Sequence, residues 1–116
     1  MNPGQHSFTC PQGTTFSKSL TYKVNKFAVN LTGYSARMQV RESYTSATTI
    51  VSLTSAEGGG MTLGGVAGTI TFTIPAATTS VLKSGTYLYD LEIVSPSGEV
   101  TRLLEGKFKV TPEITR

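Results

Sequence analysis

The sequence has few of the residues from which metal centres and catalytic sites are usually built. It contains one cysteine, one histidine and no tryptophan among 116 residues. A disulfide within the chain is excluded by the single Cys10, and one histidine with one cysteine makes no zinc-binding set. We therefore expect no cofactor and no metal. We interpret Cys10 as a small buried hydrophobe on a first strand, although its spacing from His6 leaves a Cys–His catalytic pair as an alternative.

Long apolar runs are also missing. No stretch approaches the roughly 18 apolar residues that a membrane-spanning helix needs. The first 13 residues lack the charged start and apolar run of a secretory signal. We expect a protein that is made in the cytoplasm and has no membrane partner.

Charge is sparse and scattered. Charged residues make up 15% of the sequence, and the net charge is +3. The basic residues are neither clustered nor interleaved with stacking aromatics, as they usually are in nucleic-acid-binding modules. This pattern indicates a solvated surface, so we expect no nucleic-acid partner.

The clearest pattern that is present lies between Thr86 and Val110. Apolar side chains alternate with acidic ones before residue 95, which is typical of a half-buried strand. Pro96 and Gly98 then predict a tight turn, because proline presets φ and glycine accepts positive φ. A long antiparallel hairpin is predicted, at the centre of a larger sheet. The side chains expected to point inward are Tyr87, Tyr89, Leu91 and Ile93 before the turn, and Val100, Arg102, Leu104, Gly106, Phe108 and Val110 after it.

The rest of the chain consists of short alternating segments separated by turn signals. Further strands are predicted at 14–24, 34–42, 49–54, 61–63 and 68–74, with one helical turn at 76–83. Val81 and Leu82 of that turn are expected to close one end of the core. Seven or eight short strands with turns at intervals of roughly eight to twelve residues predict an all-β, immunoglobulin-like antiparallel sandwich.

The predicted domain organisation is simple. Residues 1–13 are expected to form a flexible N-terminal arm, 14–111 the sandwich, and 112–116 a C-terminal tail. Terminal segments are usually mobile unless a surface holds them, so removal of residues 1–10 should leave a folded monomer.

One pair of acids needs a chemical interpretation. Asp90 and Glu92 share a strand face and lie about 7 Å apart by strand rise, which is compatible with a paired-carboxylate hydrolase. The simpler interpretation pairs them with cations on neighbouring strands, such as Arg102. We therefore expect no enzymatic activity and no small-molecule substrate.

Four stretches together suggest a family. They are Gln12 to Phe16, Asn30 to Arg41, Leu63 to Thr71, and Tyr89 to Glu92 continued by Arg102 to Gly106. In order and spacing they resemble small virion-associated proteins encoded in the structural-gene regions of tailed bacteriophages and prophages. They are also similar to the amino-terminal β domain of phage baseplate upper proteins, which attaches receptor-binding machinery to the tail.

The resemblance implies a non-enzymatic building block that acts by surface contact with other virion proteins. Baseplate upper proteins continue into a helical stalk, whereas this sequence ends at Arg116. We therefore expect a virion-located adaptor in the tail, baseplate or head–tail connector, with a capsid decoration protein as the alternative. The expected partners include further copies of the same chain in a symmetric oligomer, and the expected place of synthesis is the cytoplasm of the bacterial host.

The expected contact residues lie in three places, where an exposed edge or arm would pair with a neighbour. They are His6, Ser7, Phe8, Thr9 and Cys10 in the arm, Arg37 and Arg41 on a cationic face, and Thr111, Pro112, Glu113, Ile114, Thr115 and Arg116 in the tail. A carbohydrate-binding module is a further alternative, and it would use exposed Tyr34, Tyr44, Tyr87 or Tyr89. Buried tyrosine rings would count against it.

Overall fold

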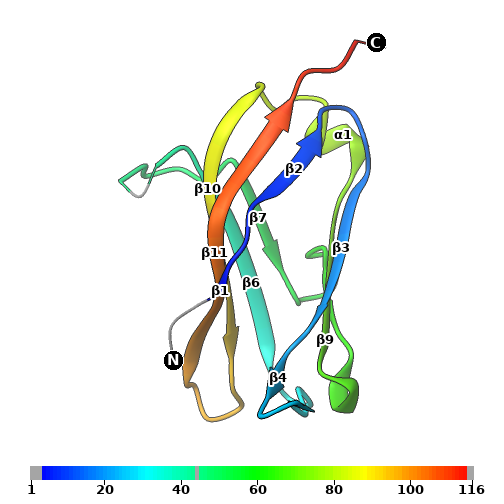
Figure 1. Cartoon of the computed structure of the whole chain (residues 1–116), viewed down its shortest axis with the longest axis vertical. Helices are drawn as coiled ribbons and strands as arrows, with labels where there is room; N and C mark the ends of the chain where they lie inside the picture. The colour runs from blue at the N-terminus through cyan, green and yellow to red at the C-terminus, as the bar shows by residue number, and fades with distance from the viewer. Residues whose placement is uncertain (1–3, 44, 115–116) are drawn as a thin grey trace.

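The computed structural model describes residues 4–43 and 45–114, which form two facing β-sheets (Figure 1). The larger sheet has the order β1-β11-β10-β6-β7, and β2 also pairs with β11. The long hairpin of β10 and β11 lies inside this sheet, as the alternation predicts. Its strands are β1 (Gly4–Gln5), β2 (Phe8–Pro11), β6 (Ser35–Arg41), β7 (Val51–Thr54), β10 (Gly85–Val94) and β11 (Val100–Thr111).

The smaller sheet has the order β3-β9-β8, and a separate two-stranded hairpin joins β4 to β5. Asn25 and Lys26 both have positive φ, 51° and 72°, which is the conformation of a two-residue type I′ hairpin turn. The remaining elements are β3 (Phe16–Thr21), β4 (Lys23–Val24), β5 (Phe27–Ala28), β8 (Met61–Leu63), the 3-10 turn η1 (Gly65–Ala67), β9 (Thr69–Ile74) and α1 (Ala76–Thr79).

The predicted all-β sandwich is confirmed. The order β3-β9-β8 opposite β11-β10-β6-β7 is that of the B-E-D and G-F-C-C′ strands in an immunoglobulin-like sandwich. At the start of β10 the Tyr87 hydroxyl donates to the Lys83 carbonyl at 2.6 Å, which is the tyrosine corner of that architecture. The pairing is not wholly antiparallel, since β1 and β2 run parallel to β11.

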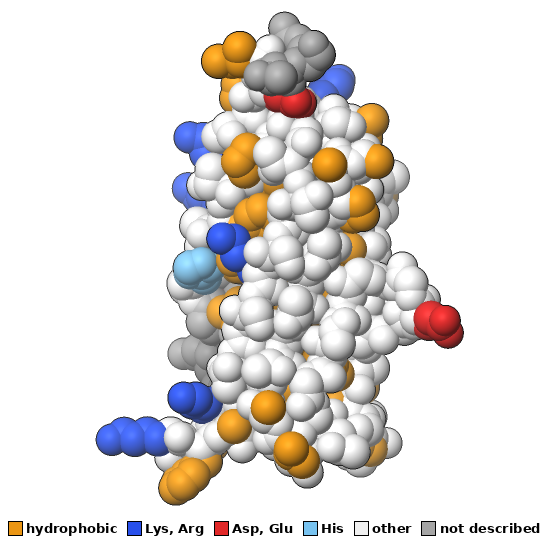
Figure 2. Space-filling model, turned by 90° about the vertical axis from the view of Figure 1, so that its right-hand side faces the viewer, with side chains coloured by type: hydrophobic (Ala, Val, Ile, Leu, Met, Phe, Trp, Pro, Cys, Tyr) orange, Lys and Arg blue, Asp and Glu red, His pale blue; other side chains and the backbone are white. Residues whose placement is uncertain are grey.

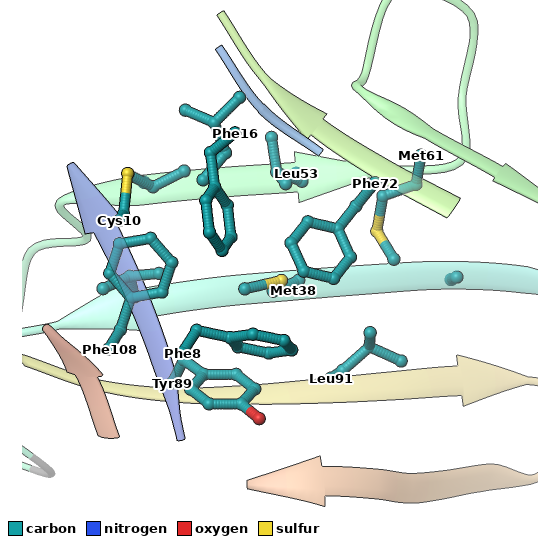
Figure 3. Close-up of a cluster of buried hydrophobic side chains, with 14 of the residues drawn as sticks. Phe8, Cys10, Phe16, Met38, Leu53, Met61, Phe72, Tyr89, Leu91 and Phe108 are labelled. Carbon is teal, nitrogen blue, oxygen red and sulfur yellow. The ribbon is translucent and has the colours of Figure 1, made fainter. Parts of the chain in front are cut away.

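Aromatic rings fill the space between the sheets (Figure 3). Phe8 lies at the centre, with ring centroids 5.5 Å from Phe72 and 5.8 Å from Phe16. The Phe16 ring in turn lies 5.5 Å from that of Phe108. These pairs are near perpendicular, the edge-to-face arrangement that aromatic quadrupoles favour. Both sheets and the N-terminal strand therefore contribute to one core.

The alternation predicted for the second hairpin strand is wrong near its start. Val100 is 49% exposed, whereas Leu103 is buried. The register shifts between Leu91 and Glu92, which pair with Leu104 and Arg102. Leu103 is thus the extra residue of a β-bulge, and a bulge reverses which side chains face inward on either side of it.

The helical turn is shorter than predicted, and its inward residue is different. α1 ends at Thr79, which is fully buried and donates its hydroxyl to the Thr14 carbonyl at 2.7 Å. Leu82 is buried as expected, but Val81 is 77% exposed. The hydrogen bond that orients Thr79 inward leaves Val81 on the outer side of the turn.

Candidate interaction surfaces

The N-terminal segment is part of the larger sheet in this structure rather than a free arm. Phe8 and Cys10 are buried, and β2 pairs with β11 along Phe8–Pro11. His6, Ser7 and Thr9 are exposed. Alternate residues of one strand face the core and solvent, so three of the five arm residues expected to make contacts lie on the surface and two do not.

The crossing from β1 to β2 is held closely against β11. The His6 N–H donates to the Glu105 carbonyl at 3.1 Å, and the Tyr89 hydroxyl donates to the His6 carbonyl at 2.6 Å. A Cβ atom on Gly106 would collide with that same carbonyl oxygen. Gly106 is therefore the position that allows the N-terminal strand to lie flat on the sheet.

The Cys–His alternative finds no support in this geometry. Burial raises the pKa of the Cys10 thiol, which disfavours the nucleophilic thiolate. The His6 ring packs instead on Phe8, with 4.7 Å between ring centroids. Among the described residues no group of three His, Cys, Asp or Glu side chains is placed to hold a metal ion.

The tail begins inside the sheet. Thr111 is the last residue of β11 and accepts a hydrogen bond from the Gln12 N–H at 2.9 Å. The Glu113 N–H donates to the Gln12 side-chain oxygen at 3.1 Å, while Pro112 is exposed and Ile114 is 94% exposed. Thr115 and Arg116 lie outside the described residues.

The face expected to be cationic carries a mixed network of charges. Arg37 pairs with Glu92 at 2.8 Å. Arg41 donates to the Ser46 carbonyl at 2.7 Å and to the Gln39 side chain at 3.0 Å. Arg37 and Arg41 therefore both have hydrogen-bonding partners within the chain. The face differs from the prediction because β10 places acidic side chains directly beside β6.

Asp90 is the member of this network whose negative charge is disfavoured by its surroundings. Arg102 lies 3.4 Å from Asp90 and 3.7 Å from Glu92, as the cross-strand interpretation predicts. Asp90 is also paired in register with Glu105, so like charges oppose each other. Desolvation, followed by the charge of Glu92, raises the pKa of Asp90 despite the opposing effect of Arg102. A shallow hollow of about 230 Å³ lies beside it.

The tyrosines named for sugar binding do not form an exposed row in the described part of the chain. Tyr87 and Tyr89 are buried, and Tyr34 is partly buried against the core. Tyr44 lies outside the described residues. The carbohydrate-binding alternative therefore lacks the platform that it needs.

A surface that the sequence analysis missed lies at one end of the sandwich. Three connections meet there: residues 22–34 between β3 and β6, residues 64–68 between β8 and β9, and the turn at 95–99 together with Val100, which follows it as the first residue of β11 (Figure 1). We call this surface the loop end. It lies opposite the end that carries α1 and the last described residues.

The loop end is held together by backbone hydrogen bonds. Tyr22 N–H donates to the Gly68 carbonyl at 2.8 Å, and Leu31 N–H donates to the Gly65 carbonyl at 2.9 Å. Leu31 is 1% exposed and anchors the connection in the core. The turn at 95–99 is closed by the Ser95 N–H to Glu99 carbonyl bond at 2.9 Å. These contacts give the loop end a defined shape.

Exposed apolar side chains gather on the loop end. Of six large hydrophobic side chains exposed in the described residues, four belong to it. Lys23 and Lys26 are adjacent in sequence to Val24 and Phe27, and Glu99 of the turn is also exposed. Figure 2 shows orange and blue side chains together at the lower end of the face in view. The four are Val24 (40% exposed), Phe27 (77%), Val66 (75%) and Val100 (49%).

The sequence did carry a signal for the loop end. Asn25-Lys26 indicates a turn, and Phe27 follows it directly. An aromatic residue next to a tight hairpin turn has few neighbouring residues that could bury its ring, so its exposure could have been predicted. The other apolar residues come from distant segments, and only the fold brings them together.

Comparisons with known proteins add little to this description. No protein-family model matches the sequence, and no curated protein matches it. Among solved structures, CopC from Methylosinus trichosporium OB3b is similar over 94% of this chain and 89% of its own, with a TM-score of 0.49 and 14% identity. A likeness of this strength bears on no functional question. No helix in the described ranges is long and apolar enough to cross a membrane.

Proposed function

We propose that this protein is a non-enzymatic structural protein of a tailed-phage virion, placed in the tail, the baseplate or the head–tail connector. It would act through contacts with other virion proteins and with further copies of itself. The sequence resemblance supports the virion location. The observation that carries the contact role is the gathering of exposed apolar side chains on the loop end.

The physical argument concerns where apolar surface is exposed. Scattered apolar residues are normal on a protein surface, but several gathered on one region mark an interaction site. Phe27, Val24 and Val66 lie on two hydrogen-bonded connections, so burying them against a partner would order little additional chain. Low ordering cost is one of the features that turn buried area into affinity. Aromatic residues are also enriched among those that dominate binding energy.

The matched test compares two equally exposed side chains at opposite ends of the sandwich. Phe27→Asp would place a charge in the proposed contact, whereas Val81→Asp changes a side chain that is likewise 77% exposed but lies beyond α1. With each variant as the only source of the protein in an infected host, quantitative mass spectrometry measures its copy number in purified particles. We expect Phe27→Asp to reduce incorporation at least tenfold, because a desolvated charge costs several kcal/mol, while Val81→Asp is incorporated normally.

The copy number of the unchanged protein tests the location separately. A count that matches the rotational symmetry of a tail or connector would support the adaptor role. A count comparable to the major shell protein would favour capsid decoration instead. Absence from purified particles would refute the virion proposal, and equal incorporation of both variants would refute the role of the loop end.

A further inference from the structure

The smaller sheet ends at β3, and one side of this strand is open. Within residues 4–43 and 45–114, β9 is the only strand paired with it. The Tyr22 N–H just after β3 donates to Gly68, on the β9 side. Backbone groups in an antiparallel pair point alternately toward and away from the partner strand. Ser17, Ser19 and Thr21 therefore direct their N–H and C=O groups to the open side.

The position of the N-terminal strands explains the opening. In a sandwich with a four-stranded A-B-E-D sheet, the first strand lies beside the second. Here β1 and β2 pair with β11 of the other sheet, so none of the strands in the described residues occupies the corresponding place beside β3. A groove of about 440 Å³ runs between the two sheets there, and Phe8, Leu20 and Leu104 contribute its apolar lining. Figure 2 shows orange side chains beside the largely white surface of the smaller sheet.

Lys18 gives the groove its charge. It shares the inward face of β3 with Phe16 and Leu20, and its ammonium lies 5.4 Å from the Phe16 ring centroid. No acidic side chain of the described residues lines the groove. An inward-pointing charge on an edge strand disfavours indiscriminate pairing with apolar strands. A partner that brings a carboxylate would satisfy this charge instead of burying it alone.

The same lysine argues against a second copy as the occupant. Antiparallel pairing of two β3 strands in the register that matches Phe16 with Leu20 would place Lys18 directly opposite its symmetry mate. Like charges in directly opposed positions destabilise a pair of strands. In the other registers Lys18 would face an uncharged residue, because β3 contains no acidic side chain. No pairing of two β3 strands therefore supplies a carboxylate to Lys18, and the open edge is better matched to a different chain of opposite charge.

We propose that the open edge of β3 binds an extended segment of a partner protein in which a carboxylate residue is flanked, two residues away on each side, by apolar residues. The backbone groups of Ser17, Ser19 and Thr21 hydrogen-bond to the segment, and its carboxylate pairs with Lys18. Its apolar side chains enter the groove against Phe8 and Leu20. This is strand addition, in which the main chain supplies affinity and alternate side chains supply specificity. This edge uses other residues than the loop end, which begins directly after it at Tyr22.

Two blocked heptapeptides test the proposal with the full chain: Ser-Val-Thr-Glu-Thr-Val-Ser, and the same peptide with lysine in place of glutamate. We expect the glutamate peptide to bind roughly threefold to tenfold more tightly at low salt, because the exchange replaces one partly exposed attraction with a repulsion of similar size. Lys18→Glu should invert this preference. Lys107→Glu, which changes an exposed lysine on the outer face of the larger sheet, should preserve it.

Amide hydrogen exchange locates the bound peptide. On addition of the glutamate peptide, exchange should slow at Ser17, Ser19 and Thr21. The proposal is overturned if the glutamate peptide fails to bind at millimolar concentration, if Lys18→Glu leaves the preference unchanged, or if protection appears elsewhere. Self-association of the free protein through β3 would also overturn it, because the occupant would then be a second copy.

Discussion

At the scale of single residues, Tyr89 connects the core to the N-terminal strand. Its ring packs 5.1 Å from that of Phe8, between centroids, and its hydroxyl donates to the His6 carbonyl. The side chain is 4% exposed. Desolvation raises the pKa of Tyr89 from 10.0 to about 12, because the buried phenol resists ionisation.

This pKa predicts a loss of stability at alkaline pH. A group whose pKa is higher in the folded state contributes stability below its unfolded pKa and loses it as the pH rises. The Tyr89 contribution should therefore decline between about pH 10 and about pH 12. Tyr89→Phe should cost about 1 kcal/mol at neutral pH through the lost hydrogen bond, and should remove this part of the alkaline decline.

Denaturant unfolding at a series of pH values measures both effects. Tyr34→Phe is the control, since Tyr34 lies at the margin of the core and away from His6. If the natural protein and Tyr89→Phe lose stability in parallel above pH 10, the ionisation of Tyr89 is not the cause.

At the scale of elements, the pairing of β1 and β2 with β11 depends on the missing side chain of Gly106. His6 passes directly over this residue, so any side chain would push the N-terminal strand outward. Gly106→Ala should destabilise the protein by about 1–3 kcal/mol, the usual cost of overpacking. Hydrogen exchange at His6 should accelerate more than exchange at β6.

Lys107→Ala is the matched control for this prediction. It changes the next residue of β11, whose side chain is exposed, and surface substitutions usually stay within about 0.5 kcal/mol. Equal stability of Gly106→Ala and Lys107→Ala would show that the strand can lift from β11 without cost.

The same elements show what local sequence could predict. The alternation predicted for β6, β9 and β10 is confirmed, because in each strand every second side chain is buried over most of its length. The parity at the start of β11 was wrong, because a bulge at Leu103 leaves no mark in the pattern of Val100, Arg102 and Leu104. The loop end was missed because its apolar residues come from connections far apart in the sequence.

At the scale of the whole molecule, the boundary of the core differs from the one that the sequence suggests. Pro11 and Gly13 indicate the end of an arm, and a short polar segment before them is typically mobile. In the structure that segment supplies Phe8 and Cys10 to the core shared by both sheets. The burial of Cys10 on a first strand was predicted and is confirmed. The burial of Phe8 was not predicted, because one aromatic residue in a polar segment gives no alternating pattern that would indicate a dry face.

The position of this boundary predicts how removal of either end of the chain affects stability. Removing residues 1–11 would take away β1, β2 and the Phe8 ring that touches Phe16, Phe72 and Tyr89. Deleting one buried phenylalanine side chain already costs about 3–5 kcal/mol, and small domains have only about 5–15 kcal/mol in total. We expect the truncated chain to lose its cooperative thermal transition or to unfold more than about 10 °C below the full chain. Removal of 112–116 should lower the transition by only a few degrees, since it leaves β11 intact. A chain without residues 1–11 that unfolds at the temperature of the full chain would restore the expectation of a free arm, and calorimetry of the three proteins decides between these outcomes.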